Sequence, residues 1–307
     1  MGAGMLSCKL LGPRYWSTWV ALGFLRLVEC MPYGAILTLG RLLGKLARRL
    51  PLRYVHIARR NIELCLPGLS PLEREQLVGR HFASLGMGVC ESAMCWWSSD
   101  ERIRSLSHVE GCEHLDCAQR RGRGVILLTA HFTTIEIGAR IMNAIRPICA
   151  LYRPLKNPVL DAISDSGRAR RARGTIRHDD IRGMIRALKN NEIVWYAPDQ
   201  SFRKKGAQMV CFFGTAAATN TGTSRLARLT GATILYFSHE RLPGGAGYRI
   251  VIHPPCESIP STDCLSDTEH FNRFIEAQVR RVPEQYWWIH RRFKGLSADY
   301  PDYYARH

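Results

Sequence analysis

A histidine and a glutamate stand at the point of the chain where reactive groups are most readily placed. His131 follows an apolar run, residues 125–130, that has the pattern of a buried parallel strand, and Glu136 comes five residues later. Ligands of open α/β sheets bind beyond the carboxyl ends of the strands, so we expect His131 in a turn and Glu136 in the first turn of the next helix. A neutral imidazole can take a proton from an attacking hydroxyl while the carboxylate fixes its tautomer. The pair indicates general-base catalysis with the substrate as nucleophile.

The same residues have a second, purely structural interpretation. Thr133-Thr134-Ile135-Glu136 also fits a capping box, in which Glu136 closes the backbone at the start of its own helix. From the residues alone the two interpretations are evenly matched. The chain lacks the motifs of several other enzyme classes. It has no Gly-x-Ser-x-Gly elbow, no Walker phosphate loop and no Gly-x-Gly-x-x-Gly after a strand.

Alternating strands and helices are expected to position the pair. The strands are expected at residues 125–130, 148–152, 175–177, 193–197, 233–239 and 248–253, and the helices at 134–144, 158–172, 181–189, 221–229 and 267–281. Upstream, Ser70-Pro71-Leu72-Glu73 predicts a capping box that opens a helix running to about residue 96. This order predicts an α/β fold with a mostly parallel sheet and helices on both faces.

The N-terminus has the composition of a membrane-associated helical segment. Residues 15–25 are apolar and aromatic, Arg26 and Glu29 interrupt the run one helical turn apart where they can pair, and residues 31–39 are apolar again. More basic residues follow this segment than precede it, which places the body of the protein in the cytoplasm. The alternative is a buried core helix followed by a solvated basic helix.

The expected organisation is therefore an anchor and basic flank over residues 1–50 and a catalytic domain over 51–307. The catalytic domain is expected to be helical over 51–121 and to have its α/β core over 122–307. Whether the N-terminal segment spans the bilayer or lies on it stays open at this point.

Composition narrows the partners and the compartment. Lys and Arg total 43 against 26 Asp and Glu, and the formal charge of +17 favours a phosphate-rich partner such as nucleic acid, anionic lipid or an acidic carrier protein. The 11 cysteines form no CxxC motif, which is typical of a reducing compartment. Cys112, His114 and Cys117 lack a second pair at zinc spacing, so we expect no metal site.

Several ordered motifs carry a resemblance to a known family. His131-Phe-Thr-Thr-Ile-Glu136 resembles the His-x4-acid motif of the late acyltransferases of lipid A biosynthesis, the lauroyl and myristoyl transferase family. The similarity continues through residues 14–16, 60–64, 152–154, 167–168, 182–183, 197–200, 212–214, 218–220 and 283–294. It covers nearly the whole chain, and motifs in order are far more specific than any one of them.

The resemblance implies an activity, its partners and its place in the cell. It implies transfer of a fatty acyl chain from acyl carrier protein to a hydroxyl of an acyl chain on the Kdo-bearing lipid A precursor. The reaction would take place at the cytoplasmic face of the bacterial inner membrane, in a fold similar to a glycerolipid acyltransferase and with no cofactor. His131 is implied as general base, Glu136 as its partner, and Arg168 and Asp199 as further active-site residues.

The residues themselves allow more than one role at these further positions. Arg168 is a candidate for stabilising the oxyanion, beside backbone amides at the helix start near Thr133, or for holding a phosphate. It also fits a solvated basic face with its neighbours in 170–173. Asp199 ends another predicted strand, where its carboxylate can orient Arg168 or simply form a turn.

A last group of residues forms the candidate contacts to an anionic lipid: Arg153, Asn220, His290, Arg291 and Arg292. The cluster at 290–292 equally fits a basic surface at the C-terminal end. The rival functions are acyl transfer to another phospholipid or glycolipid, and non-catalytic binding of nucleic acid or membrane. Basic residues are not interleaved with aromatics in an RNA-binding signature, so we expect no nucleic-acid partner. The length of the acyl chain and the hydroxyl that accepts it depend on pocket depth, which the sequence does not reveal.

Overall fold

The computed structural model describes residues 8–50, 53–169 and 174–305. In this part of the chain, seven strands form the main sheet in the order β1-β9-β8-β2-β5-β3-β4, and β6 and β7 form a separate hairpin. The bounds are β1 Ser107–Glu110, β2 Val125–Leu128, β3 Cys149–Tyr152, β4 Gly174–Arg177, β5 Ile193–Tyr196, β6 Ala207–Phe212, β7 Thr215–Asn220, β8 Thr233–Arg241 and β9 Tyr248–Ile252. Neighbouring strands of the main sheet run parallel except β8 and β9, so the predicted mostly parallel sheet is confirmed.

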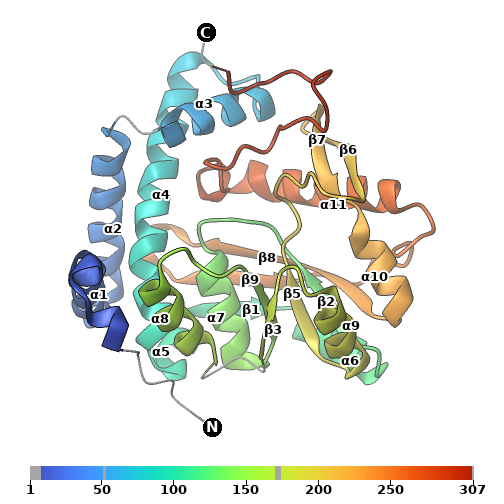
Figure 1. Ribbon diagram of the computed structural model, residues 1–307, viewed down its shortest axis with the longest axis horizontal. Helices are drawn as coiled ribbons and strands as arrows, with labels where there is room; N and C mark the ends of the chain where they lie inside the picture. The colour runs from blue at the N-terminus through green and yellow to red at the C-terminus, as the bar shows by residue number, and fades with distance from the viewer. Residues whose placement is uncertain (1–7, 51–52, 170–173, 306–307) are drawn as a thin grey trace.

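The helices fall into an N-terminal group and a group that alternates with the strands. The first group is α1 Trp16–Glu29, α2 Tyr33–Arg48, α3 Arg53–Cys65, α4 Pro71–Trp97 and α5 Asp100–Ser105. The second group is α6 Cys112–Arg120, α7 Ile135–Ile145, α8 Pro158–Ala169, α9 Ile181–Lys189, α10 Gly222–Thr230 and α11 Cys264–Arg281. Figure 1 shows the long α4 between α1 and α2 on one side and the sheet with its helices on the other.

Alternate residues of the central strand β2 face two different cores. Ile126 and Leu128 pack in one cluster with residues of α9, α10 and α11, whereas Val125 and Leu127 pack in the other with residues of α5, α6 and α7. Because side chains of a strand alternate between its faces, this short apolar run is covered by helices on both sides. Helices on both faces of the sheet were predicted and are confirmed.

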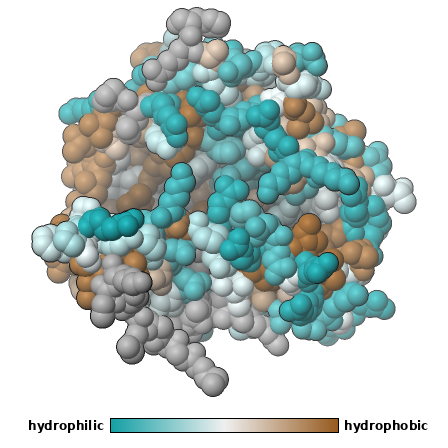
Figure 2. Space-filling model, in the orientation of Figure 1, coloured by the Kyte–Doolittle hydropathy of each residue, from teal (hydrophilic) through white to brown (hydrophobic). Residues whose placement is uncertain are grey.

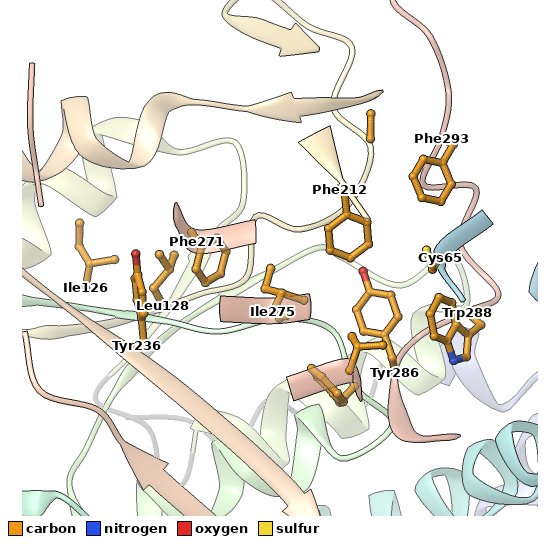
Figure 3. Packing of buried hydrophobic residues seen from close by; sticks show 14 of the residues in the cluster. Cys65, Ile126, Leu128, Phe212, Tyr236, Phe271, Ile275, Tyr286, Trp288 and Phe293 are labelled. Carbon is orange, nitrogen blue, oxygen red and sulfur yellow. The ribbon is translucent and has the colours of Figure 1, made fainter. Parts of the chain in front are cut away.

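Figure 3 shows the first of these cores where it approaches the C-terminal segment. Tyr286 lies between Trp288 and Phe212, with ring centroids 4.9 and 6.0 Å away. Aromatic rings at these distances bury a large apolar area and hold one another in fixed orientations. The packing fixes the C-terminal segment against the β6-β7 hairpin.

Glycines let α2 lie directly against α4. A Cβ atom added at Gly44 would overlap the carbonyl of Phe82, and one added at Gly86 would overlap the carbonyl of Gly40. Since no side chain separates the two backbones here, the N-terminal helices are packed onto the body of the protein. None of the helices in the described residues combines the length and the hydrophobicity that a bilayer-spanning segment requires.

Glu29, at the end of α1, joins the N-terminal segment to the body. It forms the predicted ion pair with Arg26 at 2.5 Å and a second one with Arg102 at 3.2 Å, and it accepts a hydrogen bond from Ser98 at 2.9 Å. Glu29, which interrupts the apolar run, therefore links α1 to the rest of the protein. A buried carboxylate requires such partners, which explains its presence in an apolar helix.

The sequence predicted most elements within a few residues and missed those without a clear apolar pattern. The capping box at Ser70 is present, with the Ser70 hydroxyl accepting from the Glu73 amide at 3.3 Å and the Glu73 carboxylate accepting from the Ser70 amide at 2.8 Å. The β6-β7 hairpin and strand β1 were not predicted. The helix expected at 158–172 is described to Ala169, and its expected end lies outside the described residues.

Candidate active site

His131 lies in the turn between β2 and α7, at the carboxyl end of the sheet, and the C-terminal segment holds it there. The His131 carbonyl accepts a hydrogen bond from the Trp287 amide at 3.0 Å, and the Thr133 amide donates to the Gln285 carbonyl at 2.7 Å. Phe132 pairs with Tyr286 as an antiparallel bridge between these bonds. A segment from the far end of the chain therefore fixes the backbone on which the imidazole stands.

Asp199 holds both the ring and the backbone of His131. Its Oδ1 lies 2.5 Å from His131 Nδ1, and its Oδ2 accepts from the His131 amide at 3.0 Å and from the Tyr286 hydroxyl at 3.3 Å. Asp199 follows β5, which lies beside β2 in the sheet, so both residues emerge at the same edge. The parallel register of two strands brings together residues that are far apart in the sequence.

The surroundings of Asp199 keep its carboxyl group ionised. Burial alone would raise its pKa, but the charge and hydrogen bonds of His131 and the charge of Arg292 outweigh burial, so the pKa lies below its usual value. An ionised carboxylate on Nδ1 keeps the proton on that nitrogen and leaves the lone pair of Nε2 free for a substrate. The sequence had suggested that Asp199 orients Arg168, whose side chain lies outside the described residues; the structure shows that Asp199 bonds to His131.

Glu136 lies in the first turn of α7, as predicted, and is half-buried. It borders the same apolar groove as His131. The capping-box interpretation fails, because the N-cap residue is Thr134 and no side chain caps the helix. The Thr133 hydroxyl bonds to Ser84 at 2.7 Å instead, and the Thr134 hydroxyl bonds to His239 Nδ1 at 2.8 Å.

An apolar groove of about 560 Å³ begins at His131 and runs between α2, α4 and α7. Its walls include Leu43, Ala47, Phe82, Leu85, Val89, Ile135, Ile137 and Ile289. In Figure 2 the hydrophobic surface at the left lies over α2, next to a hollow in the same face. A groove of this size and lining suits a flexible hydrocarbon chain.

A polar cavity of about 650 Å³ adjoins His131 on its other side. Its lining carries cationic side chains that reach solvent, namely Arg153, Arg203, Lys204 and Lys294, together with His178. The guanidinium of Arg153 donates to His178 Nε2 at 3.0 Å. Several cations around one open cavity form a site for an anionic group such as a phosphate or a sugar acid.

Of the other predicted lipid contacts, Asn220 and His290 also lie in this cavity. The Asn220 amide donates to the Tyr196 hydroxyl at 2.9 Å, and His290 Nε2 accepts from the Ser201 amide at 3.1 Å. Burial lowers the pKa of His290 to about 4, so its ring is neutral at pH 7. It can donate a hydrogen bond to a ligand, but it brings no positive charge.

Two of the remaining predicted arginines, Arg291 and Arg292, do not line the polar cavity. Arg292 is buried, donates to the Ala218 carbonyl at 3.0 Å and to the Thr219 hydroxyl at 2.8 Å, and so holds the β6-β7 hairpin. Arg291 lies over the ring of Tyr304, 5.5 Å from its centroid. Arg168 stands in the last turn of α8, and its side chain lies outside the described residues.

A buried ion pair is connected to the start of α7 through hydrogen bonds. The sequence did not predict this pair. Arg241 forms two bonds of 2.5 Å to the Glu91 carboxylate and donates to the Ser84 hydroxyl at 3.0 Å, and Ser84 in turn bonds to Thr133. The Tyr248 hydroxyl donates to Glu91 at 2.7 Å. Neither Arg241 nor Glu91 belongs to a local sequence motif, because the pair joins α4 to β8 and these elements are far apart in the sequence.

The described residues hold no group of three or more His, Cys, Asp and Glu side chains close enough together to bind a metal ion. Cys112, His114 and Cys117, the cluster considered from the sequence, lie on α6.

The chain matches known proteins over nearly its whole length. Residues 5–295 match the family model for bacterial lipid A biosynthesis acyltransferases. The lipid A biosynthesis lauroyltransferase of Escherichia coli K12 is 42% identical over 97% of this chain and 98% of its own. The palmitoleoyltransferase of the same pathway and strain is 41% identical over 94% of each chain. A solved 1-acyl-sn-glycerophosphate acyltransferase from Thermotoga maritima covers 78% of this chain and 94% of its own, with 19% identity and a TM-score of 0.36.

An imidazole held by a buried carboxylate, with an apolar groove on one side and a cationic cavity on the other, fits the class of transferases that join a hydrophobic group to a polar acceptor. The chain belongs to the bacterial lipid A biosynthesis acyltransferase family. It is an acyltransferase of lipid A biosynthesis.

Proposed function

We propose that the protein transfers a fatty acyl chain from acyl carrier protein to a hydroxyl of an acyl chain on the Kdo-bearing lipid A precursor. The observation that carries this proposal is the position of His131, which borders both the apolar groove and the cationic cavity. The groove suits the hydrocarbon of the donor, and the cavity suits the anionic head group of the acceptor. The two substrates then meet at the imidazole.

In the proposed reaction, Nε2 of His131 takes the proton of the acceptor hydroxyl as its oxygen attacks the thioester carbonyl. The tetrahedral intermediate collapses, the carbon–sulfur bond breaks, and the thiolate of the carrier leaves and receives the proton from the imidazolium. Asp199 keeps Nδ1 protonated throughout and stabilises the positive charge that forms on the ring. General-base catalysis of this kind accelerates a reaction by about 10² to 10⁴-fold.

Glu136 is the second carboxylate of the proposed site. It borders the groove beside His131, and we assign it to stabilising the imidazolium from the groove side. The carboxylate that bonds to Nδ1 and fixes the tautomer is that of Asp199. The imidazole therefore works with two carboxylates.

The chain length of the donor is proposed from the groove and from the relatives. Two relatives are named as lauroyl and palmitoleoyl transferases, and a groove of about 560 Å³ is large enough for chains of this class. We propose a lauroyl or myristoyl donor for this chain.

Separate kinetics for donor and acceptor test which cavity binds which substrate. Ala47→Phe places a larger side chain in the groove and so narrows it. The variant should have a higher KM for lauroyl-acyl carrier protein and an unchanged KM for the lipid acceptor. Arg203→Gln removes a cation from the other cavity and should raise only the acceptor KM. Arg228→Gln, at an exposed position of α10, is the matched control for the lost charge. If each variant raised the KM of the opposite substrate, the assignment of the cavities would be wrong.

We further propose that α1 and α2 dock the protein on the cytoplasmic face of the bacterial inner membrane. Trp16, Val20 and Leu27 of α1 are 62%, 74% and 72% exposed, and Leu42 and Leu46 of α2 are 59% and 60% exposed. Exposed basic residues, Arg41, Lys45 and Arg49, alternate with them on and just after α2. Exposed apolar side chains next to cations are typical of a helix that lies in the interface of an anionic membrane. The apolar groove, one wall of which is formed by α2, would then open towards the lipid.

Co-sedimentation with vesicles containing phosphatidylglycerol tests this docking surface. Leu42→Asp with Leu46→Asp should release most of the bound protein, since two charges replace apolar contacts at the interface. Leu229→Asp on α10, where the leucine is 63% exposed, is the control and should bind like the wild type. Equal binding of all three proteins would exclude α2 as the docking element.

A transfer assay decides between this function and its rivals. The purified protein, supplied with lauroyl-acyl carrier protein and the Kdo-bearing precursor, should form a product heavier by one acyl chain in mass spectrometry. A glycerophospholipid acceptor in a parallel reaction tests the alternative substrate class. Salt-sensitive binding of DNA or RNA without any acylated product would instead support the nucleic-acid rival.

A further inference from the structure

Acyl transfer requires a hydrogen-bond donor for the oxygen that becomes negative in the tetrahedral intermediate. We propose that the side-chain amide of Gln200 is this donor, and that it binds the thioester carbonyl oxygen of the donor substrate. The inference rests on the proposed function, since it concerns the same reaction. It adds a residue that touches the reacting atoms.

Gln200 lies where the two cavities meet. His131, Ile135 and Gln200 each border both the apolar groove and the cationic cavity, and His131 and Gln200 also border a small cavity beside Asp199. A thioester whose chain fills the groove and whose carbonyl meets an acceptor in the cavity has to pass between these residues. Of the three, only the imidazole and the amide can form hydrogen bonds to the reacting atoms.

The backbone on both sides of Gln200 is fixed, although its side chain is not. Asp199 bonds to His131, the Ser201 amide donates to His290 at 3.1 Å, and the Phe202 amide donates to the Ala218 carbonyl at 3.1 Å. Among the residues that the structure describes, the Gln200 side-chain amide has no hydrogen-bond partner. A donor on a rigid loop that has no partner in the described part of the chain can bind a ligand without breaking a bond seen there.

Two of the backbone amides near Thr133 that were expected for this role already donate to carbonyl groups of the protein. The Thr133 amide donates to the Gln285 carbonyl at 2.7 Å, and the Ile135 amide donates to the Phe132 carbonyl at 3.0 Å. Both bonds belong to the packing that holds the His131 turn. We assign the role to the Gln200 amide because it borders both cavities together with the imidazole and has no partner among the described residues.

In the reaction, the Gln200 N–H hydrogen-bonds to the carbonyl oxygen of the thioester and keeps this bond as the oxygen gains negative charge. No proton moves to or from the amide. When the intermediate collapses, the carbon–oxygen double bond re-forms and the thiolate leaves. Because the bond strengthens as charge develops, its loss should lower kcat more than it raises the donor KM.

The test compares three replacements of Gln200 with a matched control. Gln200→Met keeps the length of the side chain but removes the donor, and it should lower kcat by about 10² to 10³-fold with little change in donor KM. Gln200→Glu places a negative charge at the oxyanion and should lower kcat further. Gln200→Asn keeps an amide and should retain more activity than Gln200→Met. Gln208→Glu, at an exposed position of β6, carries the same change of charge and should behave as the wild type.

The readouts are kcat and KM with lauroyl-acyl carrier protein as the varied substrate, together with thermal unfolding to show that each variant is folded. A Gln200→Met protein with kcat within about twofold of the wild type would overturn the inference, as would a rise confined to KM. If the wild type itself transferred no acyl group from the carrier protein to the lipid precursor, the proposed function would fail first, and the inference with it. Loss of kcat in Gln200→Met alongside normal wild-type transfer supports both.

Discussion

At the scale of single residues, the chemistry depends on which group occupies Nδ1 of His131. Asp199 is there at 2.5 Å, and it also binds the backbone amide of the same residue. A carboxylate with two bonds to one histidine fixes both the direction of the ring and the tautomer. The reactive nitrogen is Nε2 for this reason.

Replacing Asp199 with Asn tests this arrangement. The amide can present its N–H to Nδ1 and so favour the wrong tautomer, and we expect kcat to fall by about 10² to 10⁴-fold. Tyr286→Phe removes only the longer 3.3 Å bond to Asp199 and should cost less than tenfold. Steady-state kinetics of the two variants should separate them, and equal, small losses would show that Asp199 does not govern the tautomer.

Buried histidines predict how stability depends on pH. Burial lowers the pKa of His239 to about 3, below the value of about 6.5 that it has in the unfolded chain. Between these pH values the unfolded chain binds a proton at this histidine that the folded protein does not bind. The contribution of the neutral ring to the free energy of unfolding is therefore fully present above pH 6.5 and is lost as the pH falls. The free energy of unfolding should decrease by about 1.4 kcal/mol for each pH unit below 6.5 per such histidine.

Urea unfolding between pH 7.5 and pH 5 measures this slope. His239→Gln should flatten the pH dependence because it removes one of the groups that must remain neutral. His108→Gln, at an exposed position of β1, should leave the slope unchanged. A wild type that is equally stable at pH 5 and pH 7.5 would contradict the expected burial of neutral imidazoles.

At the scale of elements, the wall of the groove depends on how closely α2 approaches α4. Their contact is made by glycines at which an added methyl group meets backbone atoms. Backbone atoms cannot move aside as a flexible side chain can, so the helices must separate if a side chain is introduced. The width of the groove therefore depends on glycines at this contact, of which Gly44 and Gly86 line the groove.

We expect Gly44→Ala to lower the free energy of unfolding by about 1 to 3 kcal/mol. The variant should also have a higher KM for the acyl donor, because Gly44 lies in the groove wall. Gly23→Ala in α1 is the control, since nothing lies within 4 Å of the added atom and the helix gains about 0.5 to 1 kcal/mol. Thermal unfolding of both proteins is the measurement, and a Gly44→Ala protein as stable as the wild type would exclude the close contact.

The sequence predicted the elements better than the contacts between them. Strand β2, helix α7 and the capping box at Ser70 have local patterns and were found close to their true bounds. The bond from Asp199 to His131 has no local signal, because only the order of strands in the sheet makes the two loops neighbours. The Gln200 amide and the Arg241–Glu91 pair were missed for the same reason.

At the scale of the whole molecule, the site lies where three parts of the chain converge. The sheet contributes His131 and Asp199, the N-terminal helices contribute the groove, and the C-terminal segment holds the turn that carries the imidazole. Figure 1 shows these parts arranged around the carboxyl ends of the strands. Because each part comes from a different region of the sequence, the site exists only in the folded chain.

In the proposed mechanism His131 removes the proton from the acceptor hydroxyl, and a comparison of transfer rates shows whether it does. The initial rate of acyl transfer from lauroyl-acyl carrier protein to the Kdo-bearing precursor is compared for the wild type, His131→Gln and the exposed control His108→Gln. We predict that kcat falls by about 10² to 10⁴-fold in His131→Gln, with normal thermal unfolding, and is unchanged in His108→Gln. A folded His131→Gln protein that transfers acyl chains at the wild-type rate would contradict the mechanism.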